Sequence, residues 1–137
     1  MKKAATVWLF VAVFILMAGC SFTTANLSDV KIASEIDSDL KPVTPADRFA
    51  ADAPMIYVTG TLNNAPEGTK IKIEWVYVET EPHTLIDVIE LETQEITSDF
   101  ESHLSKPDNG WPVGQYEVRL YIDDNEEPAE IAAFVVE

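Results

Sequence analysis

The sequence has only one cysteine, Cys20, among its 137 residues, so no disulfide can close within the chain. Basic side chains are also few, since nine Lys and Arg stand against 24 Asp and Glu, for a formal charge of −15. A chain this acidic is repelled by phosphate backbones, and we therefore expect no nucleic-acid partner. The length allows one domain of ordinary size and argues against two.

Catalytic and cofactor motifs are absent as well. The sequence contains no G-x-S-x-G, no glycine-rich phosphate loop and no H-E-x-x-H. His83 and His103 are the only imidazoles, and a metal or catalytic site would require them to converge with carboxylates. Nothing in their spacing requires this, so we expect both to be exposed and without function. The sequence predicts no enzyme, no cofactor and no metal site.

The first nineteen residues differ from the rest in having no acidic side chain. Lys2 and Lys3 precede an uncharged stretch from Ala4 to Ala18, and the small residue Gly19 follows. This stretch is shorter than the ~20 apolar residues that span a bilayer. A basic start, a short apolar segment and small residues at its end are typical of an export signal.

The segment Leu16–Cys20 (LMAGC) resembles the lipobox of bacterial lipoproteins, with Met17 where Leu is commonest. The resemblance implies that Cys20 is lipidated, palmitate being a usual acyl chain, and that the signal is cleaved before it. Two or three acyl chains hold a protein firmly on a membrane. We therefore expect a lipid anchor at the cell membrane or outer membrane, with the protein facing the extracytoplasmic side. An ordinary secretory signal with an incidental cysteine is the alternative.

These features divide the chain into a signal peptide (1–19), a lipidated tether (20–28) and one folded domain (29–137). Removal of Lys2 and Lys3 with the signal leaves a mature chain with a formal charge of −17. The tether is short, so the domain is expected to lie close to the membrane.

Beyond residue 29, apolar residues alternate with polar ones, the pattern of half-buried β-strands. Seven strands are expected, at 30–36, 56–62, 69–79, 85–92, 95–104, 115–122 and 129–137. In the third of these, Trp75 falls on the inward face, and in the fifth, Ile96 and Phe100 do. The proline-rich segment from Lys41 to Pro54 is expected to be a crossover with one helical turn at Pro45–Phe49.

Seven short strands with regular turns indicate an immunoglobulin-like antiparallel β-sandwich. Trp75 lies where such domains bury a tryptophan, and Tyr116 resembles a tyrosine corner, whose hydroxyl bonds back to the preceding loop. The run from Phe49 through Trp75 and Gly110–Val118 to Phe134–Val136 resembles small immunoglobulin-like domains of bacterial envelope proteins. That resemblance implies a fold and no defined activity.

Four residues form a candidate interaction surface: Trp111, Val76, Val78 and Tyr121. Trp111 is expected either to cap one end of the core or to stand exposed as a binding anchor. The other three would form an apolar patch on an outer sheet face. Cover by the crossover that carries Phe49 is the alternative to an exposed patch.

The acidic segment Asp123–Glu127 offers the oxygen ligands that calcium prefers, but it lacks the ligand order of an EF-hand loop. A solvated hairpin tip is the simpler interpretation. Together, these observations predict a membrane-anchored, non-catalytic binding module with an unidentified protein partner in the envelope. The alternatives are an inhibitor or accessory subunit of an envelope protein, and a metal-ion or solute-binding lipoprotein.

Overall fold

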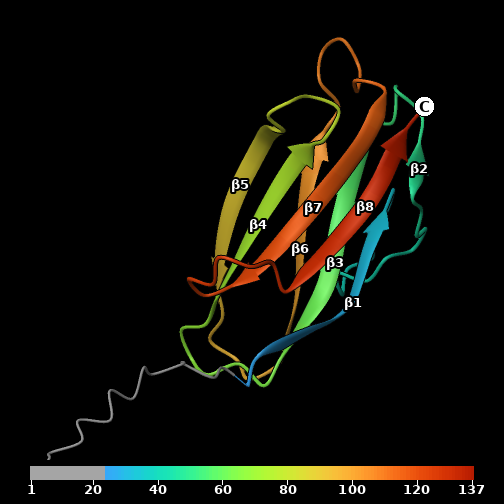
Figure 1. The fold of residues 1–137 in the computed structure, drawn as a ribbon. Helices are drawn as coiled ribbons and strands as arrows, with labels where there is room; N and C mark the ends of the chain where they lie inside the picture. Colours follow the sequence, from blue (N-terminus) through green and yellow to red (C-terminus); the bar gives the residue numbers. More distant parts are fainter. Residues whose placement is uncertain (1–23) are drawn as a thin grey trace, which may run out of the picture.

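The computed structural model describes residues 24–137, which form eight strands in two sheets and no helix (Figure 1). Within this range, accordingly, no helix has the length and apolar character needed to cross a membrane. In chain order the strands are β1 (Asn26–Ala33), β2 (Arg48–Phe49), β3 (Met55–Asn63), β4 (Lys70–Tyr77), β5 (Thr84–Glu92), β6 (Ser98–Ser105), β7 (Gly114–Ile122) and β8 (Glu130–Val136).

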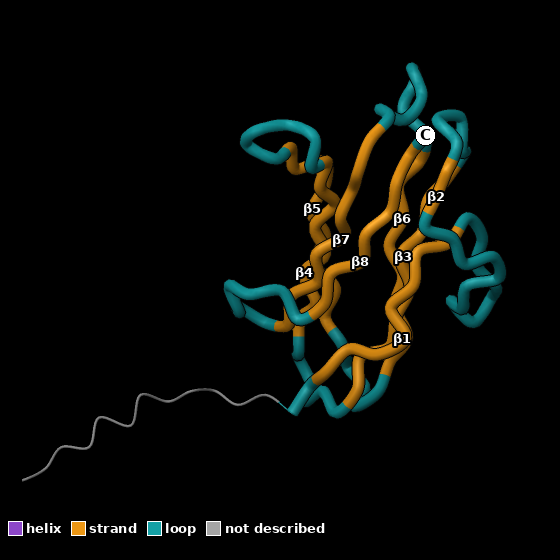
Figure 2. Tube along the Cα trace, turned by 45° about the vertical axis from the view of Figure 1, so that its right-hand side comes forward, coloured by secondary structure: helices purple, strands orange, loops and turns teal. Residues whose placement is uncertain are grey.

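The two sheets pack face to face, with connecting loops at both ends (Figure 2). One sheet has the order β1-β3-β6 and the other the order β2-β8-β7-β4-β5. All neighbouring strands are antiparallel except β2 and β8, which run parallel. The separation of β3 and β6 from β4, β7 and β8 is the arrangement of an immunoglobulin-like β-sandwich, and it confirms the predicted fold class.

The core forms where the alternating apolar residues of both sheets meet. On β4, Ile71, Ile73 and Trp75 are buried, while Lys72 and Glu74 lie on the other face. The same alternation buries one face of each of β3, β7 and β8. Because successive strand residues point to opposite faces, a period of two places one set in the core and the other outside.

Trp75 links the two sheets. It is 1% exposed, and its indole N–H donates to the Ser102 hydroxyl of β6 at 3.1 Å. Phe134 of β8 lies edge-on to its ring at 6.2 Å and stacks on the Tyr116 ring at 4.9 Å. The predicted burial of Trp75 is confirmed.

Gly60 of β3 lies opposite Phe100 of β6. A Cβ at position 60 would lie 2.6 Å from Phe100 Cζ, well inside van der Waals contact. The missing side chain therefore makes room for the Phe100 ring over the centre of the three-stranded sheet.

The predicted helical turn at Pro45–Phe49 is wrong. Pro45 forms a bridge with Ala33, and β2 pairs with β8. Two backbone hydrogen bonds join this segment to the chain at β8. Val135 N–H donates to the Asp47 carbonyl at 2.8 Å, and Glu137 N–H donates to the Phe49 carbonyl at 3.0 Å. A helical turn would leave these groups unpaired, so the edge of β8 favours an extended chain.

The predicted burial of Ile96 is also wrong, since 72% of this residue is exposed. The chain turns through residues 94–97 and β6 begins only at Ser98, whereas Phe100 is buried as predicted. At the other end, β1 begins at Asn26, before the expected start of the domain at residue 29.

Candidate functional site: the outer face of the five-stranded sheet

Trp111 closes one end of the core. It is 4% exposed, and its indole N–H donates to the Ala53 carbonyl at 2.8 Å. Its backbone N–H donates to the Ala51 carbonyl, also at 2.8 Å, and its ring lies edge-on to Tyr116 at 6.2 Å. Of the two sequence-based alternatives, the core cap is therefore correct, and Trp111 presents no exposed anchor.

Val76 and Tyr121 lie on the outer face of the five-stranded sheet, outside the main core cluster, but they are only 3% and 8% exposed. The ammonium of Lys72 lies 4.3 Å from the centroid of the Tyr121 ring. The prediction of an exposed apolar patch is therefore wrong at these two positions, and Val78 is only half-buried.

The alternative to an exposed patch was cover by the crossover that carries Phe49, and Phe49 itself does not provide that cover. Phe49 lies in the core with its ring edge-on to Phe134, at a centroid distance of 5.6 Å. Val76 is instead flanked across the strands by Leu85 of β5 and Glu117 of β7. Long side chains on neighbouring strands bury these apolar groups, because the stems of charged residues can cover apolar surface.

A row of charged side chains crosses this face. Glu117 Oε2 accepts a hydrogen bond from Arg119 Nε at 2.8 Å and lies 2.8 Å from Arg119 Nη2 in an ion pair, and Lys72 lies 3.5 Å from Glu74. Arg119 also contacts His83 Nδ1 at 3.2 Å. Because a guanidinium only donates, this imidazole nitrogen accepts.

Two tyrosines, Tyr121 on this face and Tyr116 in the core, have raised pKa values. Burial raises the pKa of Tyr121, and a hydrogen bond with Glu74 raises it further. Burial also raises the pKa of Tyr116 to about 12, with a smaller contribution from Tyr77. The Tyr116 hydroxyl donates to the Pro112 carbonyl at 2.6 Å, which is the predicted tyrosine corner.

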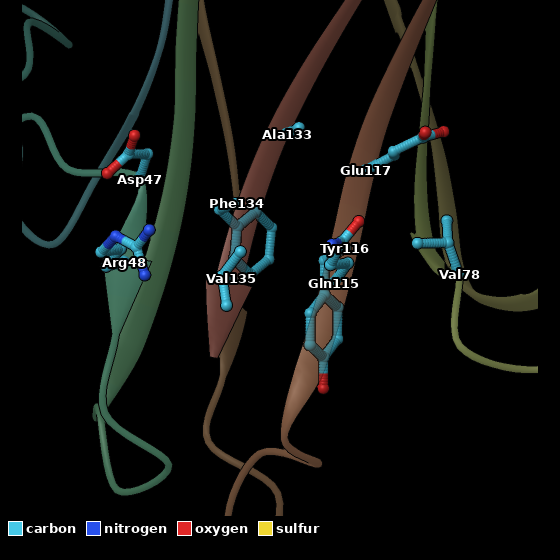
Figure 3. A pocket seen from close by; sticks show the side chains of 9 residues that line it. All are labelled: Asp47, Arg48, Val78, Gln115, Tyr116, Glu117, Ala133, Phe134 and Val135. Carbon is cyan, nitrogen blue, oxygen red and sulfur yellow. The ribbon is translucent and has the colours of Figure 1, made fainter. Parts of the chain in front are cut away.

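A shallow hollow of about 200 Å³ lies on this face beside β2 (Figure 3). Its lining residues are Asp47, Arg48, Val78, Gln115, Tyr116, Glu117, Ala133, Phe134 and Val135. The Tyr116 and Phe134 rings belong to the core, so these two residues contribute chiefly backbone. The small side chain of Ala133, opposite Glu117 on β7, leaves the depression. Arg48 and Glu117 supply opposite charges at its rim.

Four apolar side chains on the strands of this sheet are exposed: Leu85 (54%), Ile86 (42%), Val88 (41%) and Ile131 (48%). No role was expected for them from the sequence. The segment Leu85–Ile89 carries apolar residues on both faces of its strand, more than a half-buried strand needs, and this excess was the available signal.

The two histidines belong to different parts of the fold. His83 precedes β5 in the five-stranded sheet, whereas His103 lies on β6 of the other and contacts the Glu101 carboxylate at 2.9 Å. Both residues are exposed, as predicted. No group of three or more metal-ligating side chains is assembled within residues 24–137.

The acidic segment Asp123–Glu127 connects β7 and β8 as an exposed hairpin. Asp123 has a φ of 51°, its carboxylate accepts the Lys70 backbone N–H at 3.0 Å, and its own N–H donates to the Lys70 carbonyl at 2.8 Å. Asp123 therefore fastens the hairpin to β4. Cys20, the predicted lipidation site, lies outside the described residues.

The sequence matches no protein-family model, and no curated protein matches it. Among solved structures, a GH3 β-glucosidase from Bifidobacterium adolescentis is 15% identical, with a TM-score of 0.49 over 84% of this chain and 17% of the glucosidase. A β-glucosidase from Listeria innocua is 10% identical, with a TM-score of 0.47 over 82% and 15%. The sensor domain of the anti-sigma factor RsgI4 from Pseudobacteroides cellulosolvens is 13% identical, with a TM-score of 0.44 over 80% and 95%. The chain thus spans less than a fifth of either glucosidase.

Proposed function

We propose that this protein is an extracytoplasmic lipoprotein, held on a membrane by lipid on Cys20, whose sandwich binds another envelope protein and catalyses no reaction. The lipobox-like segment Leu16–Cys20 supports the anchor. β1 begins six positions after Cys20. An extended chain of that length reaches about 20 Å, so the sandwich would stand directly above the headgroups.

The observation that carries the binding role is the outer face of the five-stranded sheet. It presents exposed Leu85, Val88 and Ile131 next to the Glu117–Arg119 ion pair. Exposed apolar side chains bordered by charged groups are characteristic of protein–protein interfaces.

Labelled fatty acid tests the anchor. Cells producing the full chain should incorporate labelled palmitate into it, and Cys20→Ser should abolish both the label and sedimentation with the membrane. Unchanged labelling of the variant would refute lipidation at this residue.

Site-specific photo-cross-linking in intact cells tests the binding role. A photoreactive residue at Ile131 of β8 should give an adduct of one discrete mass. The matched control is Lys31 of β1, which is also exposed but lies on the other sheet. No adduct from Ile131, or the same adducts from both positions, would refute a binding role for this face.

A further inference from the structure

The two sheets have four edges, at β1, β6, β2 and β5, and two of them are short or covered. Along β1, Ala46 N–H donates to the Ile32 carbonyl at 3.0 Å, so residues 45–46 continue the edge. The β6 edge has eight residues, and there Lys41 of the loop between β1 and β2 reaches Asp99 at 2.7 Å. The β2 edge has two residues. The β5 edge is the longest, with nine residues, and among the described residues β5 pairs only with β4.

The register shows which backbone groups of β5 face outward. Thr93 N–H donates to the Thr69 carbonyl at 2.9 Å just beyond the strand, and antiparallel residues alternate between bonded and non-bonded pairs. Val88, Glu90 and Glu92 are therefore the residues whose N–H and C=O groups point away from β4. Consistently, Val88 N–H donates to the Asp87 carboxylate at 3.0 Å and not to β4.

The side chains of β5 make this edge apolar and anionic. Leu85, Ile86 and Val88 are exposed, and the strand contains no proline, lysine or arginine. Residues 73–105 hold nine Asp and Glu and no Lys or Arg. A long edge without proline or lysine is one onto which another strand can add. Here the outward backbone groups of Glu90 and Glu92 are available for pairing, while the Val88 N–H would have to leave the Asp87 carboxylate.

We propose that β5 binds an extended cationic segment of a partner protein, which adds to the five-stranded sheet as a sixth strand. The partner's basic residues would lie beside Glu90 and Glu92 on the outer face, and its alternate apolar residues beside Ile89 and Leu91. This inference rests on the proposed binding role and names the chemistry of the partner. A second copy of this chain is a poor occupant, because it would bring the same acidic strand and the same large negative charge.

The probe is a nine-residue peptide of alternating lysine and valine, matched in length to β5, titrated against the full chain in neutral detergent micelles at low salt. Two further versions carry N-methyl groups on either the lysine or the valine amides. Because the two sets of amides face opposite edges of a strand, one methylated version should lose binding about tenfold and the other should retain it. Equal binding by both versions would overturn the proposal, since purely electrostatic attraction does not distinguish the edges.

Charge reversal on the protein gives the second arm. Glu90→Lys with Glu92→Lys should weaken peptide binding about tenfold, because two attractive cross-strand pairs become repulsive. The matched control is Asp47→Lys with Asp52→Lys, which makes the same charge change at exposed positions near β2, across the sheet from β5. An equal loss in both double variants would overturn the proposal.

The unfolding midpoint in urea should be the same in both double variants, which establishes that each is folded. If the unaltered chain forms a dimer and the variant with Glu90→Lys and Glu92→Lys is monomeric, the strand that adds to β5 belongs to a second copy. This result would also overturn the proposal. Cross-links from Ile131 without selective peptide binding would leave the proposed function standing and remove only this inference.

Discussion

Tyr116→Phe removes one hydroxyl from the corner where β7 begins. The hydroxyl donates to the Pro112 carbonyl at 2.6 Å, while the ring stacks on Phe134 and contacts Tyr77 at a centroid distance of 4.9 Å. Phenylalanine retains these ring contacts, so the substitution isolates the hydrogen bond.

At neutral pH the variant should lose about 1 kcal/mol of unfolding free energy, the net value of one intramolecular hydrogen bond. Pro112 is exposed, so water can reach its carbonyl in the variant. The loss should therefore stay below the cost of a fully buried, unsatisfied acceptor.

The difference in unfolding free energy between the wild-type protein and Tyr116→Phe should then change with pH. Burial raises the pKa of Tyr116 from 10.0 to about 12, so the folded protein favours the protonated hydroxyl. This contribution to stability is fully present below the unfolded pKa and is lost as pH rises toward the folded pKa. Between about pH 10 and pH 12 the wild-type protein should lose about 1.4 kcal/mol per pH unit more than the variant.

The unfolding free energies of the wild-type protein and the variant should therefore become equal at about pH 11, above which Tyr116→Phe is the more stable protein. Urea unfolding of both full-length proteins in the same detergent, from neutral pH to pH 11, measures the difference. Other groups that titrate in this range are common to both chains and cancel. A difference that stays constant above pH 10 would refute the assignment of the raised pKa to the buried Tyr116 hydroxyl.

Three further changes test the core and the surface. Trp75→Ala should cost about 3–5 kcal/mol in urea unfolding, and a cost under about 1 kcal/mol would contradict its place in the core. Gly60→Ala should destabilise by about 1–3 kcal/mol, because the added Cβ meets the Phe100 ring, and Phe100→Leu should recover part of the loss. The ion pair with Lys41 holds the pKa of Asp99 below its usual range, so Lys41→Gln should raise that pKa in a carboxyl NMR titration, and an unmoved pKa would refute the pairing.

The alternation of apolar residues predicted most strands and their inward faces, because the pleat is a local property of the chain. Trp75 and Tyr116 followed from it directly. The same pattern could not give the extent of burial on the outer face. Val76 and Tyr121 are buried by long side chains on neighbouring strands, and those neighbours are fixed only when the sheet forms.

The sequence pattern likewise could not predict the order of the strands in the sheets. β2 is extended because β8 supplies its backbone partners, and nothing within residues 45–49 specifies that pairing. The exposed edge at β5 depends on the same information, since a strand is an edge only relative to its neighbours. The burial of Ile96 was predicted wrongly for a related reason, because the chain turns through residues 94–97 before β6 begins.

The attachment of β1 has a mechanical consequence. The chain enters the sandwich at Asn26, opposite Asn63, and β1 runs antiparallel to β3 from there to Ala33 (Figure 1). A pull on the residues before Asn26, back along the strand, would load the hydrogen bonds between β1 and β3 in shear, so that they share the force. A sideways pull would open the same bonds one after another. Single-molecule extension from position 24 should therefore give a higher rupture force along the strand than across it, and equal forces would exclude shear loading.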